Sequence, residues 1–299
     1  SEASGSVTME GKDRAATADR VIEIPERSAI LLTGEAGRMA TVSQEGSALS
    51  APRLEVDRAR KTVAGRGGAQ ARLLPRKDAS SSTSGLVGDP KRPVHGKAES
   101  IVLDESARVV TLAGHASLWQ DDSSISAENI TVNDKERTLV AVGSARAVLP
   151  VSSGVTPAPG KAVPAAARSV ATAPRITWTE AKSEARFEEG TTVERGTQRA
   201  TARNALARMG ADRRLDRVEM EGDVRLTDSA TGRTARAEKA VDYPKEGRTV
   251  LEGNPAVAED ADGNKVAGAS LTIRDRGRSV EVTAPSGGTT ETVHKTRRD

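Results

Sequence analysis

Apolar and polar residues alternate in many short runs along this chain, which is the pattern of strands with one buried and one solvated face. Val110-Thr-Leu112, Ile130-Thr-Val132 and Val218-Glu-Met220 are examples. Polar segments that favour turns separate the runs, such as Asp228-Ser-Ala-Thr-Gly232. The pattern therefore predicts an all-β protein built from short antiparallel strands.

A glycine recurs about every thirty residues in the same local setting, apolar–x–Gly–x–(Ala, Val or Pro)–x–apolar. A repeat of fixed period indicates one structural unit that is stacked many times. A glycine in the middle of a strand marks a bend, a bulge or a close backbone approach. With two strands for each of eight glycines, the repeat predicts roughly sixteen strands in two facing sheets. The copies centre on Gly34, Gly114, Gly143, Gly222 and Gly253, and weaker ones on Gly5, Gly65 and Gly190.

Two intervals between glycines are longer than the rest and contain segments rich in Ser, Pro, Ala and Gly. The strand pattern resumes unchanged after each of them, so we expect surface loops rather than linkers between domains. The sequence thus predicts one elongated body over residues 1–299, with exposed loops at about 76–97 and 151–174 and a flexible tail from about 285.

The composition favours a thin body over a thick globule. Only Trp119, Trp178, Phe187 and Tyr243 are aromatic, so Val, Ile, Leu and Ala must close the interior. The 45 Lys and Arg residues against 42 Asp and Glu give a net charge of +3, with both signs interspersed. This balance is typical of a solvated surface and argues against nucleic acid as a partner.

The sequence offers no catalytic or metal-binding constellation. The absence of cysteine excludes disulfides and thiolate sites. His95, His115 and His294 are isolated from other ligands, and no Ser/His/Asp set or phosphate loop is present. We therefore expect no enzyme, no metal and no cofactor. The chain opens at Ser1 without a Met, so we expect that a signal peptide or membrane anchor precedes it in the gene product.

Two segments resemble the OstA-like module of lipopolysaccharide-transport proteins. The first runs from Leu112-Ala-Gly114-His-Ala116 through Ile130-Thr-Val132-Asn133 to Val142-Gly143-Ser-Ala145. The second runs from Val218-Glu-Met220-Glu-Gly222-Asp-Val224 through Asp242-Tyr243 to Gly253-Asn-Pro255. A weaker third copy covers residues 5–73, where Arg38 stands at an expected apolar position. The resemblance includes LptA-like and LptC-like members, and an LptD N-terminal-like module fits it as well.

The resemblance implies a β-jellyroll bent like a taco shell, with an apolar groove that carries the acyl chains of lipopolysaccharide. It further implies a periplasmic bridge component whose partners are lipopolysaccharide and other Lpt-type jellyroll proteins. These would associate by pairing of edge strands, and head-to-tail homo-oligomers are also expected.

If this implication holds, the inward positions of the strands line the groove. Alternation alone fits a closed sheet core equally well, and two other functions stay open: a structural β-solenoid that binds no lipid, and a β-helix enzyme acting on polysaccharide. The groove residues expected are Ile30, Leu32, Leu54, Val56, Val63, Val110, Leu112, Leu118, Ile130, Val132, Val218, Met220, Val224, Leu226, Leu251, Val257, Leu271 and Ile273.

Overall fold

A computed structural model describes residues 1–11, 14–74, 92–150, 168–212, 214–274, 279–283 and 291–293. These residues form β-strands joined by short turns and by two single 3₁₀ turns, Pro25–Arg27 and Glu180–Lys182. The strands pair in antiparallel fashion, as between β17 (Leu215–Asp228) and β18 (Arg233–Tyr243). The predicted all-β, antiparallel jellyroll class is therefore confirmed. No helix in the described ranges is long and apolar enough to cross a membrane.

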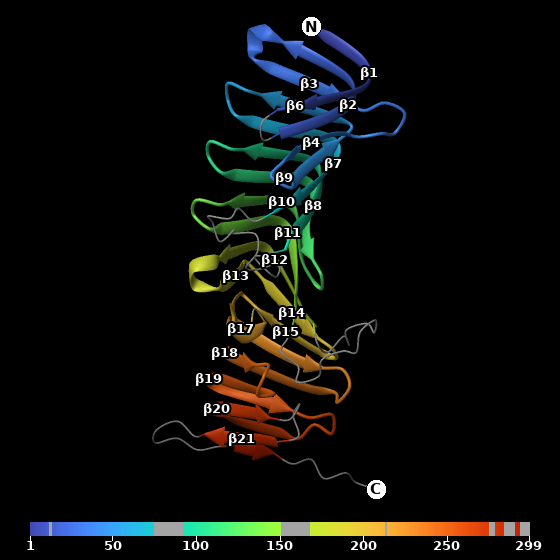
Figure 1. The fold of residues 1–299 in the computed structure, drawn as a ribbon. Coiled ribbons are helices and arrows are strands. Elements are labelled where there is room, and N and C mark those ends of the chain that lie inside the picture. The colour runs from blue at the N-terminus through green and yellow to red at the C-terminus, as the bar shows by residue number, and fades with distance from the viewer. Residues whose placement is uncertain are drawn as a thin grey trace. The chain divides into compact units, whose positions relative to one another are not determined.

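The residues gather into two compact units, each described here by itself. The first comprises Ser1–Ala145 and Thr177–Lys182, and the second comprises Arg146–Ile176 and Ser183–Asp299. Figure 1 shows β17 to β21 of the second unit stacked in chain order. The strands of the first unit are β1 (Glu2–Glu10), β2 (Arg14–Ile24), β3 (Ala29–Thr33), β4 (Ala40–Gln44), β5 (Ser47–Ala51), β6 (Arg53–Asp57), β7 (Thr62–Leu73), β8 (Val94–Asp104), β9 (Val109–Gln120) and β10 (Ser123–Asn133). β11 (Thr138–Pro150) and β12 (Arg168–Thr179) have residues in both units. The second unit continues with β13 (Glu184–Glu188), β14 (Thr191–Arg195), β15 (Gln198–Ala202), β16 (Asn204–Met209), β17, β18, β19 (Arg248–Glu259), β20 (Lys265–Arg274), β21 (Ser279–Thr283) and β22 (Glu291–Val293).

The repeated glycine bends the long strands. In β17, Gly222 has φ +83° and the next residue, Asp223, has φ +49°. The pairs Gly114–His115 in β9 and Gly143–Ser144 in β11 have the same left-handed geometry, and the ladder register shifts between Glu221 and Val224 in β17. Left-handed φ is open to glycine without steric cost, so the glycine sets the bend. In β7 the bend lies at Gly67 and Gly68, with φ +85° and +94°, rather than at the predicted Gly65.

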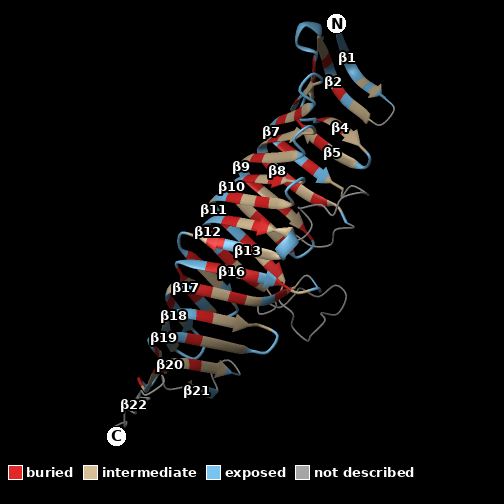
Figure 2. Ribbon diagram, turned by 90° about the vertical axis from the view of Figure 1, so that its left-hand side faces the viewer, coloured by how far each residue is buried: buried red, intermediate tan, exposed pale blue. Residues whose placement is uncertain are grey.

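Each bend divides a strand into two halves that pair with different partners. In β17, residues 215–221 pair with the second half of β18, whereas residues 224–228 pair with its first half. Both halves bury alternate apolar residues, as Val218 and Val224 show. The same alternation of buried and exposed positions runs along the strands in Figure 2. One face of the bent sheet therefore closes on itself and gives each unit two walls.

We call the walls A and B. In the second unit, wall A contains β13, β16 and residues 215–221, 239–242, 248–252 and 270–274, followed by β21. Wall B contains β14, β15 and residues 225–228, 233–236, 256–259 and 265–268, followed by β22. In the first unit, wall A contains residues 20–24, β3, β6 and residues 62–66, 100–104, 109–113 and 129–133. Its wall B contains residues 14–17, β4, β5 and residues 69–73, 94–98, 116–120 and 123–127.

The predicted number of roughly sixteen strands is wrong, because the described residues hold β1 to β22. The difference arises where a long strand breaks into two short ones instead of bending. Gly34 lies between β3 and β4, and its amide donates to the carbonyl of Pro52, which separates β5 from β6 (2.9 Å). Gly190 lies between β13 and β14, and its amide donates to the carbonyl of Arg203, which lies between β15 and β16 (2.8 Å). β21 and β22 likewise pair with the two ends of β20.

The predicted loops extend too far toward the C-terminus. β8 already begins at Val94, which is buried, and β12 already begins at Arg168. Both starting segments alternate buried with less buried residues like the rest of their strands. After Val94, however, their buried positions are held by small residues, Gly96, Ser169, Ala171 and Ala173, which give a weaker signal than large apolar side chains. Residues 75–91 and 151–167 lie outside the described residues, as do 284–290 and 294–299 in the predicted tail.

The bend predicts a specific sensitivity at Gly222. A Cβ there would lie 2.8 Å from Cβ of Arg203 and would also be strained by the positive φ. Gly222→Ala should lower the free energy of unfolding by about 2 kcal/mol, since a left-handed residue alone costs about 1–2 kcal/mol. The matched control is Gly247→Ala, where φ is +60° but no atom lies within 4 Å. Urea unfolding should show a smaller loss for the control, and equal losses would contradict the close approach at Gly222.

Candidate functional site

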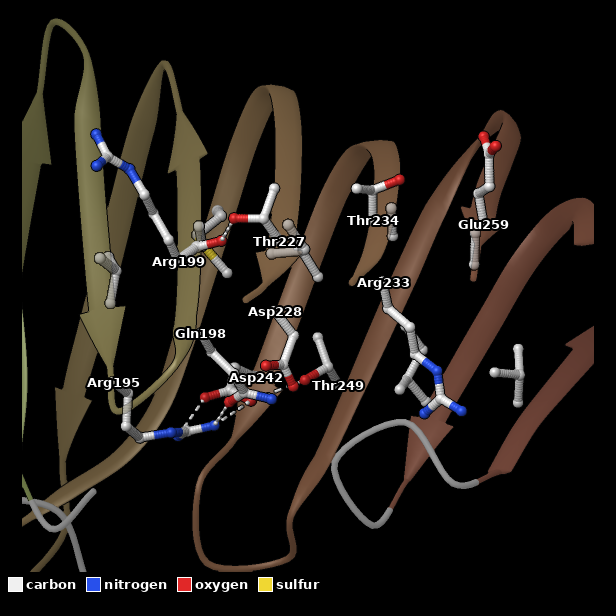
Figure 3. Close-up of a pocket in the computed structure, with 18 of the residues that line it drawn as sticks. Arg195, Gln198, Arg199, Thr227, Asp228, Arg233, Thr234, Asp242, Thr249 and Glu259 are labelled. Atoms are coloured by element: carbon white, nitrogen blue, oxygen red, sulfur yellow. Dashed lines mark hydrogen bonds and ion pairs between the residues drawn. The ribbon is translucent and has the colours of Figure 1, made fainter. Parts of the chain in front are cut away.

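The second unit holds a cavity of about 330 Å³ between its two walls. This volume lies at the lower end of the range for small-molecule sites, about 300–1,000 Å³. Residues from both halves of β17, β18, β19 and β20 line it, so the cavity lies inside the bent sheet. Figure 3 shows these strands side by side around it.

On wall B the cavity is lined by a row of mostly small side chains. Ala200, Leu226, Ala235, Ala258 and Val266 pair one after another across β15, β17, β18, β19 and β20. Residues opposite one another in a ladder point to the same face, so the row is continuous. Three of its five members are alanines, whose side chains leave the interior of this unit partly empty.

On wall A the facing row mixes apolar and polar residues. Val218, Asp242, Thr249, Ile273 and Val280 are paired across β17, β18, β19, β20 and β21, and all five line the cavity. Met220 lies next to Val218 on the inward face. The row thus offers apolar contact at both ends and a carboxylate and a hydroxyl in the middle.

The corresponding row of the first unit contains larger apolar side chains beside small ones. It runs along wall B through Val42, Leu49, Ala71, Gly96, Leu118 and Ile125, of which Leu49, Leu118 and Ile125 are each at most 1% exposed. Gly96 sits in the same row, and a Cβ there would lie 3.0 Å from Cδ2 of Leu118. Because glycine has no Cβ, the side chain of Leu118 can occupy this space. The large members of this row are packed in the first unit, whereas the row of alanines in the second unit lines a cavity.

Polar side chains from the strand ends form the rim of the cavity, as Figure 3 shows. Arg195 Nη1 donates to Asp242 Oδ2 at 2.7 Å, and Arg195 Nη2 donates to Gln198 Oε1 at 3.2 Å. Thr249 Oγ1 donates to Asp242 Oδ1 at 2.9 Å. The side chains of Arg195 and Asp242 are 21% and 14% exposed, so water screens this ion pair only in part.

The rim is close to electrically neutral. Three arginines and four carboxylates line the cavity. At one edge, the side-chain amide of Asn264 and its backbone amide both donate hydrogen bonds to the carboxylate of Asp260. These bonds, the side-chain one first, hold the pKa of this carboxyl below its ordinary value. A rim of this kind is suited to a ligand that is held mainly by apolar contacts and not by a net charge.

The structure brings only some of the expected groove residues to the cavity. Val218, Met220, Leu226 and Ile273 line it. Val224, Leu251 and Leu271 belong to the same unit but are fully buried in the packed sheet. In the first unit, Val56 and Val110 are half-buried, and the buried members are Ile30, Leu32, Leu54, Val63, Leu112, Leu118, Ile130 and Val132.

Val257 lies on the outer face, contrary to its expected inward position. It is paired with Arg236, which is exposed, whereas its neighbour Ala258 is paired with buried Ala235. The ladder register shifts between Glu252 and Ala256, after Gly253. This shift reverses the parity that the repeat would otherwise give, because every one-residue offset exchanges the two faces of a strand.

Sequence reasoning missed the other residues that define the cavity. Ala200, Ala235 and Ala258 were overlooked because alanine gives a weak apolar signal, although their alternation with charged residues carries the strand period. Arg195 was overlooked because its partner Asp242 lies 47 positions away. Only the pairing of the strands brings the two together.

No group of three or more His, Asp or Glu residues with a metal-binding arrangement occurs in the part of the chain that the structure describes. His95 stacks on Trp119 with ring centroids 5.7 Å apart, and His115 lies 3.8 Å from Glu128 on the surface. His294 lies outside the described residues.

Comparison with known proteins supports the family resemblance. Residues 69–138, from the second half of β7 to the first residue of β11, match the model of the LptA/(LptD N-terminal domain) LPS transport protein family. The OstA-like resemblance is confirmed for this segment. It includes the Leu112–Gln120 strand and the Ile125–Asn133 strand on which the resemblance was recognised.

Among solved structures, one similar chain is LptH from Pseudomonas aeruginosa, described as the LptA-homologous periplasmic component of a lipopolysaccharide transport device. The identity is 15%, the match covers 44% of this chain and 82% of LptH, and the TM-score is 0.36. At this level the likeness carries no argument about function. A search of curated proteins gives no match.

Proposed function

We propose that this protein binds the acyl chains of lipopolysaccharide in the cavity of its second unit and helps carry the lipid across the periplasm. The observation that carries the proposal is an apolar cavity open between two walls of an OstA-like jellyroll, lined by Val218, Met220, Leu226 and Ile273. Each methylene removed from water there contributes about 0.8 kcal/mol. The near-neutral rim leaves the headgroup in water.

The two alternative functions fit the structure less well. A polysaccharide-acting β-helix has parallel coils, whereas the pairings described here are antiparallel. A purely structural solenoid needs a closed core along its whole length. The row of alanines on wall B of the second unit works against such closure and favours a ligand site.

Inward and outward residues of β17 test the proposed lipid site. Leu226→Gln should weaken binding of lipopolysaccharide to the delipidated protein about tenfold, because it removes apolar contact and places an amide against acyl chains. Arg225→Gln is the matched control: it is the adjacent residue, exposed, and paired with Asp223 on the outer face at 2.9 Å. Fluorescence titration should give nearly wild-type affinity for the control. Absence of binding by the wild type, or equal loss in both variants, would count against the proposal.

We also propose that the chain associates head to tail, and with other Lpt-type jellyroll proteins, through its terminal strands. Among the described residues, β1 is paired only with β2 and β21 only with β20. Val280 of β21 is 38% exposed, which is unusual for a large apolar residue. An unpaired edge strand is a template for a partner strand.

Replacement of Val280 tests this association. Val280→Pro should keep the protein monomeric at concentrations at which the wild type associates, because proline removes a ladder donor at the edge. Light scattering over a concentration series measures the association, and circular dichroism checks that the variant keeps its strands. Because backbone hydrogen bonds carry the contact, the wild type should respond little to added salt. A wild type that stays monomeric throughout would refute the proposed assembly.

A further inference from the structure

In the second unit an ion pair joins the two walls across the mouth of the cavity. Arg195 is the last residue of β14 on wall B, and Asp242 lies near the end of β18 on wall A. Their side chains meet in two bonds, at 2.7 Å and 3.4 Å. Both residues lie several positions away from the bends, at the free ends of the two walls. The contact therefore lies where the bent sheet would otherwise be open.

The first unit has a contact of the same kind. Arg14 begins β2 and is paired with Gln44 on wall B, whereas Glu105 follows the last residue of β8 on wall A. Arg14 Nη2 donates to Glu105 Oε1 across 91 residues of sequence. An arginine of wall B bound to a carboxylate of wall A thus occurs at the mouth of both units.

Asp242 stands where the sheet has no structural need for a charge. In the first unit, the row at the same distance from the bends holds one carboxylate, Glu23, which lies in β2 and binds Arg58 at 3.3 Å. Its other members are apolar: Ile30, Val56, Val63, Leu103, Val110 and Val132. A valine or leucine at 242 would fit the row of the second unit in the same way. A largely buried ion pair gives little net stability relative to apolar packing. In the second unit the pair also stands in front of a cavity, so it can act on whatever enters there.

An amphiphile held in the cavity must extend through this mouth, because its acyl chains lie inside and its headgroup lies in water. A bond between the walls blocks that passage until it breaks. Of the two partners, the guanidinium can then rebind an anion, and its planar fork matches phosphate as well as carboxylate. Gln198 and Thr249 remain beside the two separated groups and can satisfy part of their hydrogen bonding.

We propose that Arg195 is the binding residue for a phosphate on the headgroup of the bound lipid, and that Asp242 occupies it when the cavity is empty. The exchange opens the mouth for a phosphorylated amphiphile and keeps it closed to an uncharged one. This inference rests on the proposed lipid-binding function. It adds to that function a selectivity for phosphate at one named side chain.

Two amphiphiles with the same alkyl chain length test the exchange in the protein of residues 1–299: dodecyl phosphate and dodecyl maltoside, both below their micelle concentrations. Arg195→Gln should weaken dodecyl phosphate about fivefold, because the phosphate loses its guanidinium partner, and should strengthen dodecyl maltoside, because the ion pair no longer closes the mouth. Asp242→Asn should tighten dodecyl phosphate, because the competing carboxylate is gone. The matched control is Lys239→Gln, which removes a cation paired with Glu221 at 2.8 Å on the outer face and should change neither affinity.

A distance measurement tests the wall contact without any ligand. The chain has no cysteine, so Ala230→Cys and Glu246→Cys place two unique spin labels on exposed turns at the ends of wall B and wall A. Arg195→Gln should lengthen and broaden the distance distribution between them, as should dodecyl phosphate in the protein with Arg195. An unchanged distribution in the variant would overturn the wall-to-wall contact.

The outcomes separate this inference from the proposed function. A protein that binds both amphiphiles, with equal effects of Arg195→Gln on each, would refute the phosphate exchange and leave the lipid site intact. A wild type that binds neither amphiphile would refute both. Weaker binding of dodecyl phosphate after Asp242→Asn would also overturn the exchange, because it would show that the carboxylate favours phosphate binding instead of competing with it.

Discussion

The left-handed bend in the long strands is the constraint on which the rest of this structure depends. A straight amphipathic sheet leaves its apolar face in water, and this chain has few aromatic rings with which to cover it. Bending each strand at a pair such as Gly222 and Asp223 lets one sheet cover itself. The glycine adopts the first positive φ freely, while the second residue adopts it at some cost. Burial on both walls offsets that cost.

The same architecture yields two different interiors, and side-chain size decides between them. Leu118 and Ile125 are packed in the first unit, while Ala235 and Ala258 line a cavity in the second. The backbone pattern is common to both, so fold alone does not specify a ligand site. The properties of the ligand site then depend on a few side chains in the rows nearest the mouth. Asp242 is the clearest of them, since it brings a charge and a partner from the other wall.

Strand period and glycine spacing were sufficient to predict the class, the bends and most inward positions, because both are local properties of sequence. What they could not predict depends on register. Val257 lies on the outer face because the ladder register shifts after Gly253. At Gly34 and Gly190, what was expected to be one long strand is two short ones. Arg195 and Asp242 meet through pairing of strands far apart in the sequence. Alternation also cannot distinguish a groove from a packed core. The resemblance placed Leu112 in a groove, and the structure shows it fully buried.

The most direct test of the central claim is to locate bound lipopolysaccharide on the protein. A leucine-sized diazirine amino acid at position 226 would report contact inside the cavity, and the same amino acid at position 236 would report contact on the outer face. After irradiation with lipopolysaccharide, the account predicts a covalent lipid adduct at 226 and little or none at 236. Equal labelling at both positions, or labelling at 236 alone, would contradict it.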